Sequence, residues 1–276
     1  MNKNIFSLLI IFSLLSFSVF AQKKIVILHT NDTHSRIEPM PANDKYNANI
    51  GGVVRRESYL NQVRSENKNV LVFDSGDFLQ GTPYFNLFKG KVEIEAMNLM
   101  KYDAVTLGNH EFDYGLDVLK DVVKQSKVPF ITTNYDFTNT PLAGMTKQYE
   151  IFVKDGVRIG VIAIGVQPKG LIASENYKNM KYLSPIETAN EIATYLKKKK
   201  RCDAVVCLSH LGYEDDLEFA AKSLNIDFIL GGHSHTFMKK PETKKNAAGA
   251  DVTLFHNGDK GLYVGRLDVE LKAVKQ

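Results

Sequence analysis

The sequence predicts an α/β fold, arranged as a layered α/β/β/α sandwich with two mixed sheets. Two observations lead to this fold class. Five buried-type apolar runs alternate with helical patterns, which is typical of parallel strands joined by helices. Two further segments look like antiparallel hairpins, and adding them to parallel strands gives mixed sheets.

The five apolar runs share one pattern along the chain. Each is rich in Val, Ile, Leu or Phe and ends in Asp, Asn or His: "KIVILHTNDTH", "NVLVFDSGD", "DAVTLGNH", "DAVVCLSH" and "DFILGGHSH". Their apolar residues are continuous rather than alternating, which indicates strands that are buried on both faces.

The segments between these runs have helical periodicity. Helices are predicted over residues 53–66, 92–101, 116–124, 187–200 and 215–224. The stretch "YEIFVKDGVRIGVIAIG" predicts a hairpin that turns at Asp155-Gly156. The stretch "DVTLFHNGDKGLYVGRLDVELK" predicts a second hairpin near the C-terminus.

The N-terminal residues have the pattern of a targeting signal. "MNKNIFSLLIIFSLLSFSVFAQ" joins Lys3 to an apolar stretch and then to Ala21, so we predict a signal peptide over residues 1–21 and an exported protein, periplasmic or extracellular. The apolar stretch is shorter than the roughly 20 residues that a spanning helix needs, and no later segment could span. A single domain is predicted over residues 22–276.

The net charge argues against a nucleic-acid groove, and the cysteine spacing argues against a disulfide. The 35 basic and 31 acidic residues give a net charge of +4, too mild to suggest a nucleic-acid groove. Cys202 and Cys207 are five positions apart, about 16 Å on an extended strand, which is beyond the reach of a disulfide. Both are predicted to be free thiols.

Polar residues cluster where the predicted strands end. The loops at the carboxyl ends of such strands converge on one crevice, and this rule collects eight residues: Asp32, His34, Asp77, Asn109, His110, His210, His233 and His235. Five of the seven histidines belong to this set. Each residue alone could be a turn, a helix cap or a structural histidine. His29 and His256 are expected in the core or behind the ligands rather than among them.

These residue types suit a divalent metal. Imidazoles, carboxylates and an amide oxygen are ligands for Zn, Mn or Fe, and the lack of thiolates argues against a structural zinc site. In an extended backbone, residues i and i+2 face one side, so Asp32 with His34, and His233 with His235, could each reach one centre. The candidates are too many for one tetrahedral ion, so two ions with a shared carboxylate are expected. Such a centre carries net positive charge and attracts a phosphate dianion.

Five motifs, in this order, resemble the calcineurin-like metallophosphoesterases and within them the secreted 5′-nucleotidase family: "NDTH", "GDFLQGT", "GNHEFDYG", "SHLG" and "GGHSH". The similarity extends to "GGVVRRESYLNQVR" and "GLYVGRLDVEL". The resemblance implies that Asp77 bridges two ions. It assigns one ion to Asp32, His34 and His235, and the other to Asn109, His210 and His233. His110 would face the leaving group, and Asp113 would orient it.

The resemblance also implies an activity. We expect an exported dinuclear phosphoesterase that hydrolyses phosphate monoesters, above all 5′-nucleotides, through attack by a metal-bound hydroxide. The alternatives are a broad phosphomonoesterase, a cyclic-nucleotide phosphodiesterase, a sugar-nucleotide pyrophosphatase, or a non-catalytic surface-binding protein. The chain ends at Gln276, where the first domain of such enzymes ends. The C-terminal nucleotidase domain is therefore expected to be absent, and a separate chain of that kind could be a partner.

Overall fold

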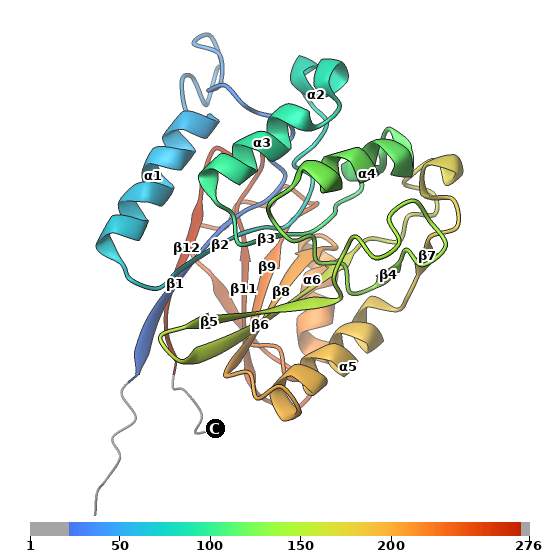
Figure 1. The fold of residues 1–276 in the computed structure, drawn as a ribbon. Coiled ribbons are helices and arrows are strands. Elements are labelled where there is room, and N and C mark those ends of the chain that lie inside the picture. Colours follow the sequence, from blue (N-terminus) through green and yellow to red (C-terminus); the bar gives the residue numbers. More distant parts are fainter. Residues whose placement is uncertain (1–21, 272–276) are drawn as a thin grey trace, which may run out of the picture.

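The computed structural model describes residues 22–271 and contains two mixed β-sheets that pack face to face between two layers of helices (Figure 1). The predicted α/β/β/α class is confirmed. The predicted signal peptide, residues 1–21, lies outside the described residues. Within the described range, no helix is long and apolar enough to cross a membrane.

The first sheet has the strand order β12-β1-β2-β3. Its strands are β1 (Lys23–Thr30), β2 (Val70–Asp74), β3 (Ala104–Val105) and β12 (Gly265–Leu271). β1, β2 and β3 run parallel, and β12 is antiparallel to β1. The helices on its outer side are α1 (Val53–Glu66), α2 (Pro83–Phe88), α3 (Lys91–Met100) and α4 (Gly115–Gln125). The helix expected over residues 53–66 has these bounds.

The second sheet has the order β10-β11-β9-β8-β6-β5. Its strands are β5 (Tyr149–Lys154), β6 (Val157–Gly165), β8 (Ala204–His210), β9 (Phe228–Gly231), β10 (Glu242–Lys245) and β11 (Asp251–His256). The helices α5 (Pro185–Lys198) and α6 (Tyr213–Lys222) cover it. The remaining elements are β4 (Tyr135–Asp136), β7 (Lys181–Tyr182) and the short 3-10 helices η1 (His110–Phe112) and η2 (Ser174–Tyr177).

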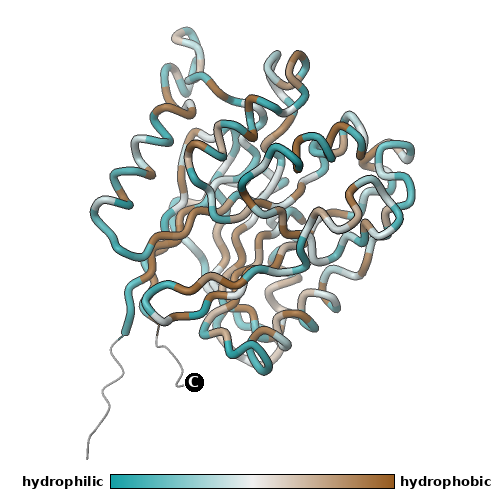
Figure 2. Tube along the Cα trace, viewed as in Figure 1, coloured by the Kyte–Doolittle hydropathy of each residue, from teal (hydrophilic) through white to brown (hydrophobic). Residues whose placement is uncertain are grey.

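The core explains why the strands are apolar without alternation. On β1, Val26 and Leu28 pack toward the α1–α4 helices, whereas Ile25 and Ile27 pack between the two sheets. All four side chains are at most 1% exposed, so both faces of the strand exclude water. In Figure 2 the central strands are accordingly the most hydrophobic part of the trace.

One hairpin prediction is confirmed and the other is wrong. β5 and β6 pair around Asp155 and Gly156, whose φ angles of 51° and 86° suit a tight hairpin turn. β11 and β12, however, belong to different sheets, because β12 pairs with β1 rather than with β11. The connection crosses from one sheet to the other, and on the way the Lys260 amide donates a hydrogen bond to the Asp32 carbonyl over 2.7 Å. Two strand-like runs in succession do not reveal which partner each will choose.

The cysteine prediction is confirmed. Cys202 and Cys207 are both free and buried. Cys207 lies within β8, and Cys202 precedes that strand on the side of α5, where both thiols join the core between the second sheet and its helices. The fold is therefore held by packing and hydrogen bonds.

Candidate metal centre

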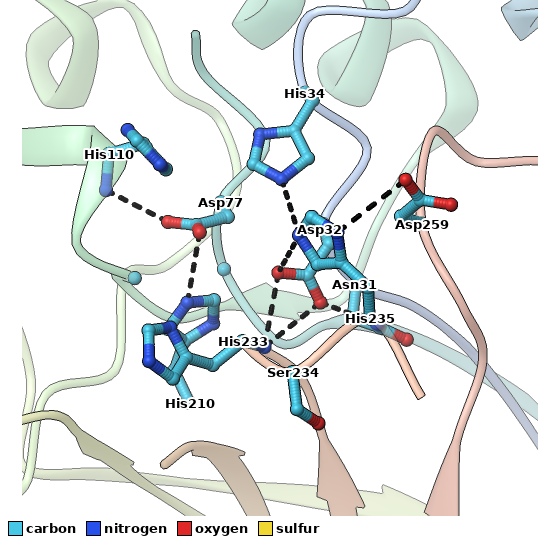
Figure 3. A network of polar contacts seen from close by, with 12 residues as sticks. Asn31, Asp32, His34, Asp77, His110, His210, His233, Ser234, His235 and Asp259 are labelled. Carbon is cyan, nitrogen blue, oxygen red and sulfur yellow. Dashed lines mark hydrogen bonds and ion pairs between the residues drawn. The ribbon is translucent and has the colours of Figure 1, made fainter. Parts of the chain in front are cut away.

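The loops after β1, β2, β3 and β9, together with the end of β8, bring the predicted residues to one place. Figure 3 shows the side chains of Asp32, His34, Asp77, His210 and His235 gathered there from both sheets. Two groups of potential ligand atoms form there, and within each group the atoms lie within 4.8 Å of one another: Asp32, His34 and His235, and Asp77, His210 and His233. The first group is the ligand set that the resemblance implies for one ion. The second group contains His210 and His233 of the other set, together with Asp77.

The first group is built around Asp32. His34 Nε2 lies 2.9 Å from His235 Nε2, which in turn is 3.6 Å from Asp32 Oδ1. Asp32 is fully buried and accepts hydrogen bonds from the Asn31 side chain (2.6 Å) and from the His233 backbone amide (3.0 Å). Burial raises the pKa of Asp32 to about 7, and His210 opposes the shift. A carboxylate buried in this way requires positive charge beside it.

The second group is built around Asp77 and His210. His210 Nε2 lies 3.1 Å from Asp77 Oδ2, and His210 Nδ1 is 2.7 Å from the Ser75 carbonyl. Because a carbonyl oxygen only accepts hydrogen bonds, His210 Nδ1 carries a proton and donates a hydrogen bond to the Ser75 carbonyl. This leaves Nε2 to face the site. Burial opposes a charge on His210, but Asp77 raises its pKa to about 10. A divalent ion between these two side chains would take the place of the proton that they share.

Gly108 allows the close approach of these side chains. A Cβ atom at Gly108 would lie 2.2 Å from Asp77 Oδ1 and 2.5 Å from His210 Nε2. Any other residue there would displace one of the two. The Gly in "GNH" is thus required by space at the site rather than by a turn.

The backbone at the site differs from the expected extended form. Five of the candidate ligands have a left-handed φ: Asp32 (49°), His34 (46°), Asp77 (55°), His233 (73°) and His235 (54°). The prediction that i and i+2 residues meet on one side of an extended strand is therefore wrong in its geometry. His233 and His235 belong to different groups, and Asp32 and His34 meet through a turn. Such conformations cost free energy in non-glycine residues and are typical of functional sites.

The buried polar atoms of the site fit metal ions. Two of them, His34 Nδ1 and Asn109 Oδ1, have no hydrogen-bond partner within the described residues, and His210 Nε2 has only the Asp77 carboxylate beside it. Buried polar atoms without partners are rare and call for an explanation. Imidazole nitrogen, amide oxygen and carboxylate oxygen are the donors that divalent Zn, Mn and Fe accept. The residues present therefore fit two divalent ions.

His110 and Asp113 lie at the open side of the centre. His110 Nδ1 is 2.9 Å from Asp113 Oδ2, and the two side chains are 32% and 35% exposed. The hydrogen bond to Asp113 raises the pKa of His110, an effect that partial burial opposes. The rings of His110 and His34 have centroids 5.4 Å apart. His110 is thus next to the ligand groups, belongs to neither, and is accessible from solvent.

Glu111 is a site residue that the sequence analysis did not identify. Its carboxylate is buried and accepts backbone amide hydrogen bonds from Asp77 (2.9 Å), Leu79 (3.0 Å) and Gly108 (2.6 Å). Burial, helped by the charge of Asp77, raises the pKa of Glu111 to about 8, while the amide donors oppose the shift. Glu111 ties the loop after β2 to the loop after β3, and so fixes Asp77 relative to Asn109. The sequence feature that could have identified Glu111 is its position directly after His110 in the motif "GNHEFDYG".

We predict that Glu111→Ala lowers the free energy of unfolding by about 3–5 kcal/mol, because three buried amides lose their acceptor. Chemical denaturation of the purified protein measures this loss. Asp117→Ala removes an exposed acid from the following helix and should change stability by less than about 0.5 kcal/mol. Equal stability of the two variants would contradict the role given to Glu111.

His256 supports the site from behind. Its Nε2 is 2.8 Å from Asp216 Oδ2, both side chains are fully buried, and a Cβ at Gly231 would lie 2.0 Å from that nitrogen. The pair therefore packs under the glycine that leads into the loop of His233. His29 is also buried, stacked edge-on against Phe255. Neither histidine joins a ligand group, in agreement with the core or supporting role expected for both.

The chain is similar to proteins of known family. The sequence model of the calcineurin-like phosphoesterase family matches residues 25–237 of this chain. The trifunctional nucleotide phosphoesterase protein YfkN of Bacillus subtilis is 29% identical over 89% of this chain and 18% of its own length. The NAD 5′-nucleotidase of Haemophilus influenzae is 36% identical over 76% of this chain and 36% of its own length. The chain thus spans less than half the length of these curated relatives.

A solved structure has the same fold and similar sequence. The 5′-nucleotidase precursor from Thermus thermophilus superposes with a TM-score of 0.85 at 33% identity, covering 92% of this chain and 54% of that one. The family match covers most of the chain, and the two ligand groups are of the kind that divalent metals bind. The chain belongs to the calcineurin-like phosphoesterases, a family of metal-dependent phosphoric ester hydrolases.

Proposed function

We propose that the protein hydrolyses phosphate monoesters, and 5′-nucleotides in particular, at a dinuclear metal centre. One observation carries this proposal: two carboxylate–imidazole groups lie side by side at the carboxyl ends of both sheets, with His110 at their open side. The matched relatives named as nucleotidases support nucleotides as the substrate class.

The residues are assigned as follows. One ion would be held by Asp32, His34 and His235, and the other by Asn109, His210 and His233. Asp77 would be shared between them. When bound, two divalent ions (Zn, Mn or Fe) would lower the pKa of a water molecule and neutralise the charge of the phosphate oxygens.

His110 and Asp113 act on the leaving group. Asp113 accepts a hydrogen bond from the His110 Nδ1–H group, which orients the ring and favours the protonated imidazole. The other ring nitrogen, Nε2, then donates a proton to the leaving oxygen as the ester bond breaks, which is general acid catalysis by a positioned imidazole. Asp113 touches His110 rather than the substrate and is a positioning residue.

We further propose that the protein is exported, on the basis of the predicted signal peptide, and that residues 22–276 form one catalytic domain. A separate chain similar to a C-terminal nucleotidase domain stays a prediction. The alternative activities also use two metals and a positioned acid, so the substrate rather than the centre distinguishes them.

A substrate panel tests the proposal. The mature chain, loaded with Mn²⁺ or Zn²⁺, is expected to release phosphate from AMP and from simple monoesters faster than it cleaves a diester or a sugar nucleotide. Activity should disappear on chelation and return with metal. Full activity after chelation, with no metal left by elemental analysis, would contradict the dinuclear assignment.

A further inference from the structure

A groove of about 400 Å³ opens beside the candidate metal centre. His233, a candidate ligand, forms part of its wall. The apolar part of the lining comes mainly from five side chains: Leu171, Tyr182, Ile186, Leu211 and Phe219. Small-molecule sites have volumes of about 300–1,000 Å³ and are mostly apolar with a few polar groups, which describes this groove.

A chain segment that lines the groove also contacts the turn that follows His110. Its wall includes Val166 and Leu171, from the segment that leads from β6 through η2 to β7. In the same segment, the Asn176 side chain donates a hydrogen bond to the Asp113 carbonyl over 2.9 Å. Figure 1 shows this segment beside α4. One segment thus borders both the groove and the turn after His110, and His233 places the groove next to the second ligand group.

The charge in the groove is negative. Among the described residues, its lining contains Asp215 and Glu218 from α6 and no lysine or arginine. Glu218 forms an ion pair with Lys222, and the structure gives Asp215 no such partner within residues 22–271. Tyr182 and Asp215 both line the groove. Burial raises the pKa of Tyr182, and the Asp215 carboxylate raises it further.

We infer that this groove binds the leaving group of the substrate, and that it selects a flat apolar group bearing an amine over one bearing a second anion. The inference rests on the proposed phosphoesterase function. Leu171, Tyr182 and Ile186 supply the apolar surface, and Asp215 accepts a hydrogen bond from the amine or pairs with its positive charge. A second phosphate or carboxylate in the groove would meet Asp215 without a compensating cation.

A series of benzyl phosphates tests the selection by charge. The para substituent is aminomethyl, methyl or carboxymethyl, and methyl phosphate serves as the reference without a ring. These substituents are insulated from the reacting oxygen, so differences in rate report contacts in the groove. We expect kcat/KM to be about tenfold higher for the amine than for the acid at low ionic strength, since one exposed carboxylate attracts one and repels the other. Salt near 1 M should remove most of that ratio.

Variants identify the residue responsible. Asp215→Asn should reduce the amine-to-acid ratio to about twofold, whereas Glu214→Gln, on the adjacent exposed position outside the groove lining, should leave it near tenfold. Leu171→Asn should lower the preference for the methyl-substituted benzyl ester over methyl phosphate by about threefold to tenfold, because an exposed apolar wall is lost. Leu99→Asn, exposed on α3 and outside the groove, is the matched control.

The outcomes distinguish failure of the groove assignment from failure of the proposed phosphoesterase function. Hydrolysis of all members with equal kcat/KM, or an unchanged ratio in Asp215→Asn, would overturn the groove assignment and leave the phosphoesterase intact. A metal-loaded protein that hydrolyses none of the series, methyl phosphate included, would overturn the proposed function and this inference with it.

Discussion

Asp77→Asn should lower the metal content from about two ions per chain to less than one and reduce kcat/KM by about 10⁴-fold, or ~5.5 kcal/mol. The reason is position: Asp77 is buried, lies 3.1 Å from His210 and is the carboxylate assigned to both ions. Asparagine keeps the shape and one oxygen but removes the negative charge that two cations share. Elemental analysis after gel filtration, together with phosphate release, measures both effects.

The fold should survive this substitution. The His110 backbone amide donates to Asp77 Oδ1 over 2.9 Å, and the side-chain amide in the Asp77→Asn variant still offers one oxygen to accept that bond. Asp117→Asn is the control for loss of one exposed carboxylate and should change neither metal content nor kcat/KM. Two ions per chain in Asp77→Asn would show that this residue does not bridge them.

His110→Ala should lower kcat by roughly 10²- to 10⁴-fold, the usual scale for a lost general acid, while metal content stays near two ions. The loss should depend on the substrate. An alkyl monoester needs a proton on its leaving oxygen, whereas a 4-nitrophenyl ester leaves readily as the anion. The variant should therefore be far more impaired on the alkyl ester.

This substrate dependence separates proton donation from other roles. An equal loss on both esters would indicate that His110 stabilises charge or positions the phosphate without donating a proton. Loss of metal comparable to that in Asp77→Asn would make His110 a ligand. Asp113→Asn should produce a weaker form of the His110→Ala pattern, because it acts only through the orientation of that ring.

Much of the centre could be predicted from sequence because strand ends are recognisable. A buried parallel strand is a continuous apolar run, and the first polar residues after it lie at the shared edge of the sheet. That reasoning places Asp32 and His210 together although they are far apart in the chain, and Figure 3 shows both in the same cluster of side chains. The helix over residues 53–66 is also predicted, with the bounds that the structure has.

What could not be predicted depends on tertiary packing. The left-handed backbone at His34 is held from a neighbouring loop, because the His34 amide donates a hydrogen bond to the Asp77 carbonyl over 3.0 Å. Arg56 has the sequence context of a surface residue, yet it is only 5% exposed, because Gly261 has no Cβ and leaves room for its guanidinium. Glu111 likewise acts on amides in a distant loop, and its role appears only when that loop is in place.

The pairing of β12 with β1 has a consequence for how the chain folds. β1 begins at Lys23 and its partner ends at Leu271, so this ladder joins opposite ends of the described chain. Contacts of such high sequence separation lose loop-closure entropy before they gain pairing energy, and they slow folding. The hydrogen bond from the Lys260 amide to the Asp32 carbonyl cannot form before that late segment has been synthesised and docked. Assembly of the catalytic centre is therefore expected to be among the last events in folding, after each βα unit has collapsed on its own.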